Sequence, residues 1–172
     1  ITTEIICQDG LSYAPLSPAR YREYGRYLSG LLGEPPDGLA TDSFGAFRAA
    51  YDGKGINVAT LVPHGAIRLG AAGFEDVQLE GSLLEAARAA VRDGMRAGAH
   101  GFSTGLSYYP NSFSTTDELV ALCEVVAAEG GVYVTHIRDH EVDRAFGGGG
   151  ITEAIEIARR SGVKLHISHY RT

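Results

Sequence analysis

The sequence has few cysteines, no long apolar run and no basic cluster. Two cysteines, Cys7 and Cys123, cannot build a disulfide framework and favour a reducing cytoplasm. A membrane span would need about 18 consecutive apolar residues, and no stretch approaches that length. No basic segment precedes an apolar one as in a signal peptide. The formal net charge of −6 argues against nucleic acid and membrane surfaces as partners. Small molecules are the expected ligands.

What is present has the pattern of an α/β domain. With 44% hydrophobic and 21% charged residues, the composition is that of a globular protein. Apolar, β-branched segments alternate with helical patterns along the chain. These strand candidates are residues 2–7, 56–62, 100–104, 131–136 and 163–168. Strict alternation of strands and helices predicts a parallel sheet.

The spacing of the later strands is close to one strand, loop and helix each, as in a (β/α)8 TIM barrel. A closed barrel needs eight strands, so we expect a partial barrel of about five consecutive βα units. The alternative, an open doubly wound sheet, predicts a glycine-rich turn after the first strand, and residues 8–12 lack it. The chain begins inside a strand-like run and stops past a strand tip. We therefore expect residues 1–172 to be the central part of a longer barrel domain.

Helix starts are marked by local signals. Pro18 opens one helical pattern, and capping boxes at residues 82–85 and 115–118 open two more. In the first capped helix Leu83 is expected to face inward, and in the second Cys123 is expected to be a small buried hydrophobe.

Two strand candidates end on a histidine. His136 and His169 lie about one βα unit apart, so consecutive parallel strands would bring their imidazoles to one point, where barrels place their chemistry. We interpret the pair as ligands of a metal ion. His166, three residues before His169, is expected by alternation to face the helical layer and to be structural.

A third ligand is expected from the end of the first strand, where two residues compete. Cys7 offers a soft thiolate but lies deep in the apolar run, whereas Asp9 offers a carboxylate in a turn. The sequence leaves this choice open. It also leaves two roles open for His64, which follows the second strand and either faces substrate or braces the loop.

Several motifs together resemble the N-acyl-D-amino-acid deacylases (D-aminoacylases) of the amidohydrolase superfamily. They are GFSTGLSYYP at residues 101–110, STTDEL at 114–119, GGVYVTHIRD at 130–139 and HISH at 166–169. The likeness includes DGLSYAP at residues 9–15 and covers nearly the whole chain. Members of the family are zinc-dependent (β/α)8 enzymes that hydrolyse the amide of N-acyl-D-amino acids with a zinc-activated hydroxide.

The resemblance implies that His136 and His169 bind zinc, in a site of one or two ions. The family has a cysteine ligand within Asn-Cys-Gly where this chain has Asp9, a harder ligand that changes the expected metal preference. Arg171 stands where the family has a lysine that contacts the substrate carboxylate. Tyr108 and Tyr109 would line the same mouth, unless they only pack.

Other features of the superfamily have no counterpart in the sequence. The His-x-His pair of its first barrel strand and its general-base aspartate are missing, so the base is expected outside this chain, and 172 residues alone are expected to be inactive. The rest of its own barrel or a homo-oligomer would complete the fold. Two rival functions are a dihydroorotase-like cyclic amide hydrolase and a non-catalytic metal- or ligand-binding fragment.

Overall fold

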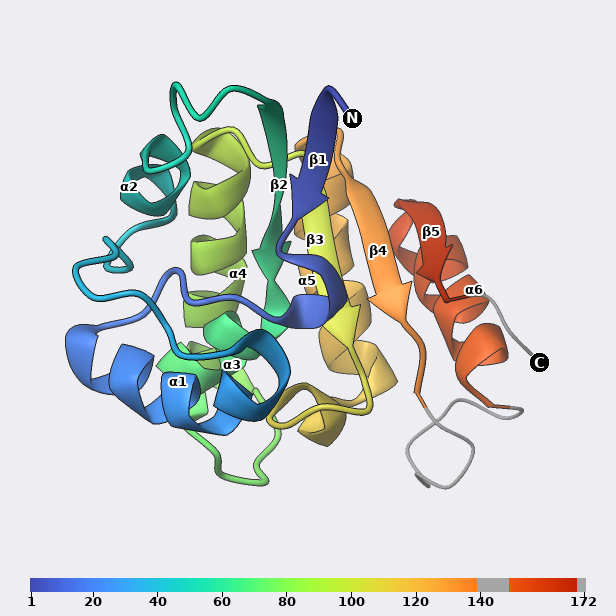
Figure 1. The fold of residues 1–172 in the computed structure, drawn as a ribbon. Helices are drawn as coiled ribbons and strands as arrows, with labels where there is room; N and C mark the ends of the chain where they lie inside the picture. The colour runs from blue at the N-terminus through green and yellow to red at the C-terminus, as the bar shows by residue number, and fades with distance from the viewer. Residues whose placement is uncertain (139–148, 170–172) are drawn as a thin grey trace.

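Five parallel strands form one curled sheet, a half-barrel, in the order β1-β2-β3-β4-β5 (Figure 1). The computed structural model describes residues 1–138 and 149–169. The strands are β1 (Thr3–Ile6), β2 (Asn57–Pro63), β3 (Gly101–Gly105), β4 (Val132–His136) and β5 (Lys164–Ser168). All five strands were predicted, and each bound lies within one residue of its expected position. The partial-barrel prediction is thereby confirmed.

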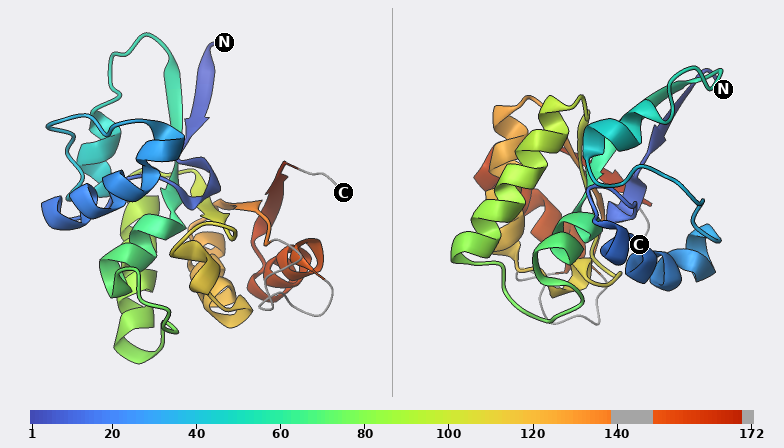
Figure 2. Two further views of the ribbon diagram at one scale, coloured as in Figure 1. Left: turned by 60° about the horizontal axis from the view of Figure 1, so that its bottom comes forward. Right: turned by 90° about the vertical axis from the view of Figure 1, so that its left-hand side faces the viewer.

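Helices connect the successive strands of the sheet. They are α1 (Pro18–Leu32), α2 (Phe44–Ala49), α3 (His64–Ala72), α4 (Gly81–Arg96), α5 (Thr116–Ala128) and α6 (Gly150–Ser161), with 3₁₀ turns η1 (Gln8–Gly10) and η2 (Asn111–Phe113). Figure 2 shows α4, α5 and α6 on one side of the sheet and α1 on the other. Within the described residues, no helix has the length and apolarity to cross a bilayer.

The main core lies between the sheet and its helices. Phe102 and Tyr133, from neighbouring strands, are fully buried and stack with ring centroids 6.2 Å apart. Alternation then turns Ser103 and Val134 to the concave side, because successive strand residues face opposite ways. The concave side of β3 and β4 is therefore the side on which polar residues near the strand tips can meet.

The two capping-box predictions have different outcomes. Thr115 caps α5 by accepting a hydrogen bond from the Glu118 amide at 3.3 Å, and Cys123 in that helix is buried, so both predictions are confirmed. The box at residues 82–85 is wrong, because α4 begins two residues earlier, with Glu80 in place of Ser82 as its N-cap and no side-chain bond to the cap. Leu83 is 38% exposed instead of inward, while Leu84 packs against the core.

His166 does not face the helical layer, so that prediction is also wrong. The register pairs His166 with Val134 and Ser168 with His136, which places His166 on the concave face, where it is exposed. The sequence argument counted alternation back from His169, but β5 ends at Ser168 and His169 has a left-handed backbone with φ of 50°. Alternation does not extend to a residue in that conformation.

Candidate metal centre

Asp9, His136 and His169 converge at the carboxyl ends of the strands, and one ligand atom from each lies within 4.8 Å of the others. We call these three residues the carboxylate–histidine cluster. Asp9 Oδ2 lies 3.1 Å from His169 Nε2 and 3.8 Å from His136 Nδ1. The two imidazole rings are 5.3 Å apart between centroids. The structure thus brings together the three residues that the sequence singled out, while their role as ligands stays a prediction.

Asp9 reaches the cluster because the chain turns inward after β1. Strands in a sheet are spaced by about 4.8 Å, so three spacings would separate β1 from β4 by roughly 14 Å in a flat sheet. The curl of the sheet shortens this path, and η1 covers the remainder by crossing to the ends of β3 and β4 (Figure 1). Cys7 and Asp9 have left-handed backbones, with φ of 64° and 56°.

The donor atoms of the cluster fit a metal ion. A carboxylate and two imidazoles are a ligand set of catalytic zinc sites, which leave one position open. Ligand atoms about 2.1 Å from a tetrahedral ion lie roughly 3.4 Å from one another, a value between the two distances to Asp9 Oδ2. Asp9 Oδ1 and His136 Nδ1 are buried and have no hydrogen-bond partner among the described residues. Buried polar atoms without a partner call for an explanation, and a bound metal ion would supply one here.

The carboxylate of Asp9 is in the form that a cation requires. Burial alone would raise the pKa of Asp9, but attraction to the imidazoles of His136 and His169 outweighs it and holds that pKa below its ordinary value. Asp9 is therefore ionised at neutral pH.

Cys7, the competing candidate, lies outside the cluster. Its side chain is buried next to the hydrophobic core, and burial raises the pKa of the thiol to about 11. A protonated thiol is a poor ligand. The geometry favours Asp9 in the choice that the sequence left open.

The two tyrosines at the mouth differ in placement. Tyr108 lies against the His136 imidazole, with centroids 5.2 Å apart, and therefore borders the cluster. Tyr109 packs on Phe113 at 5.0 Å, and its amide donates to the hydroxyl of Tyr27. Arg171 lies outside the described residues.

His64 lies in the interior, at the start of α3. It is fully buried, and its Nε2 faces Glu118 Oε1 at 3.0 Å, while Arg68 donates to the other oxygen of the same carboxylate. Burial lowers the pKa of His64, whereas His64 and Arg68 together hold the pKa of Glu118 below its ordinary value despite burial. A neutral imidazole thus donates to an ionised carboxylate. This placement favours the bracing role over substrate contact.

Sequence reasoning missed a second buried ion pair, two residues after His136. Arg138 is 1% exposed and binds both oxygens of Glu153 in α6, at 2.8 and 3.2 Å. It also donates to the carbonyl oxygens of Ser112 and Ser114 at 2.9 and 3.0 Å. We call Arg138 and Glu153 the arginine clamp. An arginine that directly follows a histidine-bearing strand tip was the available signal.

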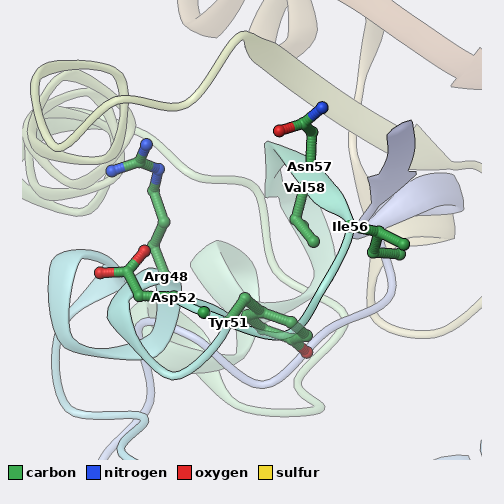
Figure 3. Close-up of a pocket in the computed structure, with 7 residues that line it drawn as sticks. Arg48, Tyr51, Asp52, Ile56, Asn57 and Val58 are labelled. Atoms are coloured by element: carbon green, nitrogen blue, oxygen red, sulfur yellow. The ribbon is translucent and has the colours of Figure 1, made fainter. Parts of the chain in front are cut away.

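A hollow at the opposite end of the sheet shares no residue with the cluster (Figure 3). It is lined by Arg48, Tyr51, Asp52, Gly53, Ile56, Asn57 and Val58. These residues lie at the amino end of β2, whereas α/β barrels carry their chemistry at the carboxyl ends. The hollow is therefore a weaker candidate site than the cluster.

Comparisons with known proteins agree with the motifs. The chain is 34% identical to N-acyl-D-glutamate deacylase of Alcaligenes xylosoxydans xylosoxydans over 176 residues, 99% of this chain and 34% of that protein. The chain resembles the N-acyl-D-amino-acid deacylases. The chain spans about a third of the length of the curated relatives that it matches. No protein-family model matches it.

Solved deacylase structures share the fold. N-acyl-D-glutamate deacylase from Bordetella bronchiseptica, complexed with zinc and a phosphonate that mimics the tetrahedral intermediate, superposes with a TM-score of 0.80 at 31% identity over 96% of this chain and 33% of that one. A D-aminoacylase described as defining a novel subset of amidohydrolases gives 0.78 at 26% identity, over 99% of this chain and 35% of that one. The half-barrel therefore corresponds to part of an amidohydrolase barrel.

Proposed function

We propose that this protein is a metal-dependent amidohydrolase that cleaves the amide bond of N-acyl-D-amino acids. The observation that carries the proposal is the convergence of Asp9, His136 and His169 from three strand ends. One buried oxygen of Asp9 and one buried nitrogen of His136 also have no hydrogen-bond partner in the part of the chain that the structure describes. The similarity to deacylases over nearly the whole chain supports the substrate class. Residues 1–172 are, in this proposal, the central part of a longer (β/α)8 domain.

Asp9, His136 and His169 would hold one zinc ion. Once bound, that ion would polarise the amide carbonyl and lower the pKa of a water molecule towards about 7. The carboxylate of Asp9 supplies the negative charge that a cysteine supplies in the related family. An oxygen ligand is harder than a thiolate, so Asp9 shifts metal preference towards harder divalent ions.

Arg171 and Tyr108 would orient the substrate. A guanidinium can bind the α-carboxylate of an N-acyl amino acid through two parallel hydrogen bonds, which fixes its direction as well as its position. Tyr108 borders His136, so its ring would limit the space beside the scissile amide. The proton-transferring aspartate would come from a part of the domain outside these residues.

The test is hydrolysis by the full-length protein with zinc. We expect N-acetyl-D-glutamate or another N-acetyl-D-amino acid to be hydrolysed, and the L enantiomers, which serve as matched controls, to be hydrolysed far more slowly. His136→Ala should lose both the bound zinc and the hydrolysis. Preferential turnover of dihydroorotate would assign the protein to the cyclic amide hydrolases. Zinc binding without turnover of any amide would make it a binding domain.

The state of the two cysteines supports a proposal about the compartment. Cys7 and Cys123 are both free and buried, and thiols persist in that form where the environment is reducing. We propose that the protein works in the cytoplasm.

A further inference from the structure

Ser103 joins the middle of β3 to both ends of the turn that carries Asp9. Its side chain is fully buried, and its hydroxyl donates to the carbonyl oxygen of Cys7 at 2.5 Å. The hydroxyl oxygen of Ser103 in turn accepts a hydrogen bond from the Gly10 amide at 3.1 Å. One hydroxyl therefore bridges residues 7 and 10, which flank Asp9 on either side. Both partners lie more than 90 residues away in the sequence.

The turn needs such a partner because its backbone is not in a regular conformation. Cys7 and Asp9 are both left-handed, a conformation that non-glycine residues adopt only when surrounding contacts hold it. Within the turn, the Leu11 amide donates to the carbonyl oxygen of Gln8 at 3.0 Å. Ser103 supplies a tertiary bond on each side of Asp9, and without it a buried carbonyl and a buried amide would lose their partner.

Gly105, two residues after Ser103 in β3, allows the backbone of the same turn to lie directly against the strand. It pairs with His136 in the sheet register and therefore lies at the level of the cluster. A Cβ atom at Gly105 would overlap the carbonyl oxygen of Asp9 and approach the Tyr108 ring. The backbone of Asp9 thus rests directly on β3, and Ser103 fastens it there.

We propose that Ser103 is a positioning residue for the metal centre. Through its two bonds to the turn, it holds the Asp9 carboxylate at the place where it meets His136 and His169. The inference rests on the proposed function, since it assumes that Asp9 is a metal ligand. It adds a residue that touches neither metal nor substrate and acts only through the backbone of residues 7–10.

The chain offers a matched control in the next residue. Thr104 is fully buried like Ser103, and its hydroxyl bonds Tyr133 and Thr135 at 3.0 and 2.8 Å on the helical side of the sheet. Thr104→Val therefore removes two buried hydrogen bonds from the same strand without touching the turn. A loss of stability alone should affect Ser103→Ala and Thr104→Val alike.

The experiment measures zinc affinity of the full-length variants by competition with a chelator, and the visible absorption of the cobalt-substituted forms. We expect Ser103→Ala to weaken zinc binding about 10- to 100-fold, the range found for residues that orient metal ligands, and to change the cobalt spectrum. Ser103→Thr, which keeps the hydroxyl, should recover most of the affinity. Thr104→Val should stay within about twofold of wild type by the same comparison. Equal affinities for Ser103→Ala and Thr104→Val would overturn the proposal.

Two further measurements keep this inference separate from the proposed function. If Asp9→Asn binds zinc like wild type, the ligand set is wrong whatever Ser103 does. If Asp9→Asn weakens binding and Ser103→Ala does not, only the role of Ser103 fails. Amide hydrogen exchange in wild type needs no variant to fold: the Gly10 amide should be protected, and more so with zinc. Exchange of that amide at the rate of an open loop would also overturn the proposal.

Discussion

Two polar groups at the carboxyl ends of the strands differ in how completely their atoms are paired. In the arginine clamp, both oxygens of Glu153 bind Arg138, and the guanidinium also serves two carbonyl oxygens. In the carboxylate–histidine cluster, Asp9 and His136 each keep a buried atom without a partner among the described residues. A closed network holds loops in place, whereas an open one has capacity for a ligand. Burial and charge alone would not separate the two.

Breaking the closed network should give the largest effect. Arg138→Met leaves Glu153 buried without its cation, a change that typically costs about 3–5 kcal/mol. The measurement is urea unfolding of the zinc-free protein. The control is Arg159→Met, which removes an exposed partner of Glu156 within α6 and should leave the free energy of unfolding almost unchanged, because solvent screens such a pair. Similar losses for the two variants would contradict the assignment of Arg138 as a structural clamp.

Removing a residue of the open network should instead abolish the response to metal. At a zinc concentration about 100 times the dissociation constant, a protein that binds only when folded gains about 2.7 kcal/mol. We expect wild type to show this gain and His169→Ala to show almost none, by thermal unfolding with and without zinc. His166→Ala is the control, because His166 lies on β5, the strand that leads to His169, but outside the cluster. An unchanged gain in His169→Ala would remove that histidine from the ligand set.

The contrast also explains which parts of the site were predictable. The proximity of His136 and His169 follows in part from parallel order, which brings the carboxyl ends of neighbouring strands together. His169 itself lies one residue past β5, and its left-handed backbone is not displayed by the sequence pattern. The approach of Asp9 depends on the curl of the sheet and on a left-handed turn bonded to Ser103 far along the chain. The arginine clamp was missed because most arginines are exposed, and a sequence does not show which arginine has a buried partner such as Glu153.

The fold shows the same division. Strand bounds were predicted well because each strand is a compact apolar segment. α3 was missed because it starts at His64 directly after β2, with no capping side chain and with glycines at positions 65 and 70 that lower helix propensity. Gly65 is needed there, since a Cβ atom would overlap the Tyr24 hydroxyl. Tertiary packing, not local preference, makes this segment a helix.

A smaller effect is expected from crowding the turn under Asp9. In Gly105→Ala the added Cβ would meet the carbonyl oxygen of Asp9, and overpacking of this kind costs about 1–3 kcal/mol. Chemical denaturation measures the loss. Gly30→Ala in α1 is the control, because nothing lies within 4 Å of its Cβ position and alanine favours a helix. Should Gly105→Ala be as stable as Gly30→Ala, the turn does not rest on β3 as described.

The smallest effect should be the pH dependence that Asp9 adds to the zinc-free protein. Its pKa is lower in the folded state than in the unfolded chain, so ionised Asp9 stabilises the fold above the ordinary carboxyl pKa of about 3.9, and this contribution is lost as the pH falls through the folded value. The side chains of the cluster are partly exposed, so solvent screening keeps the contribution of Asp9 to stability small. The difference in melting temperature between wild type and Asp9→Asn should therefore shrink below about pH 4. Asp52→Asn, at an exposed position, is the control. A difference that widens on acidification would mean that the imidazoles do not favour the charged form of Asp9.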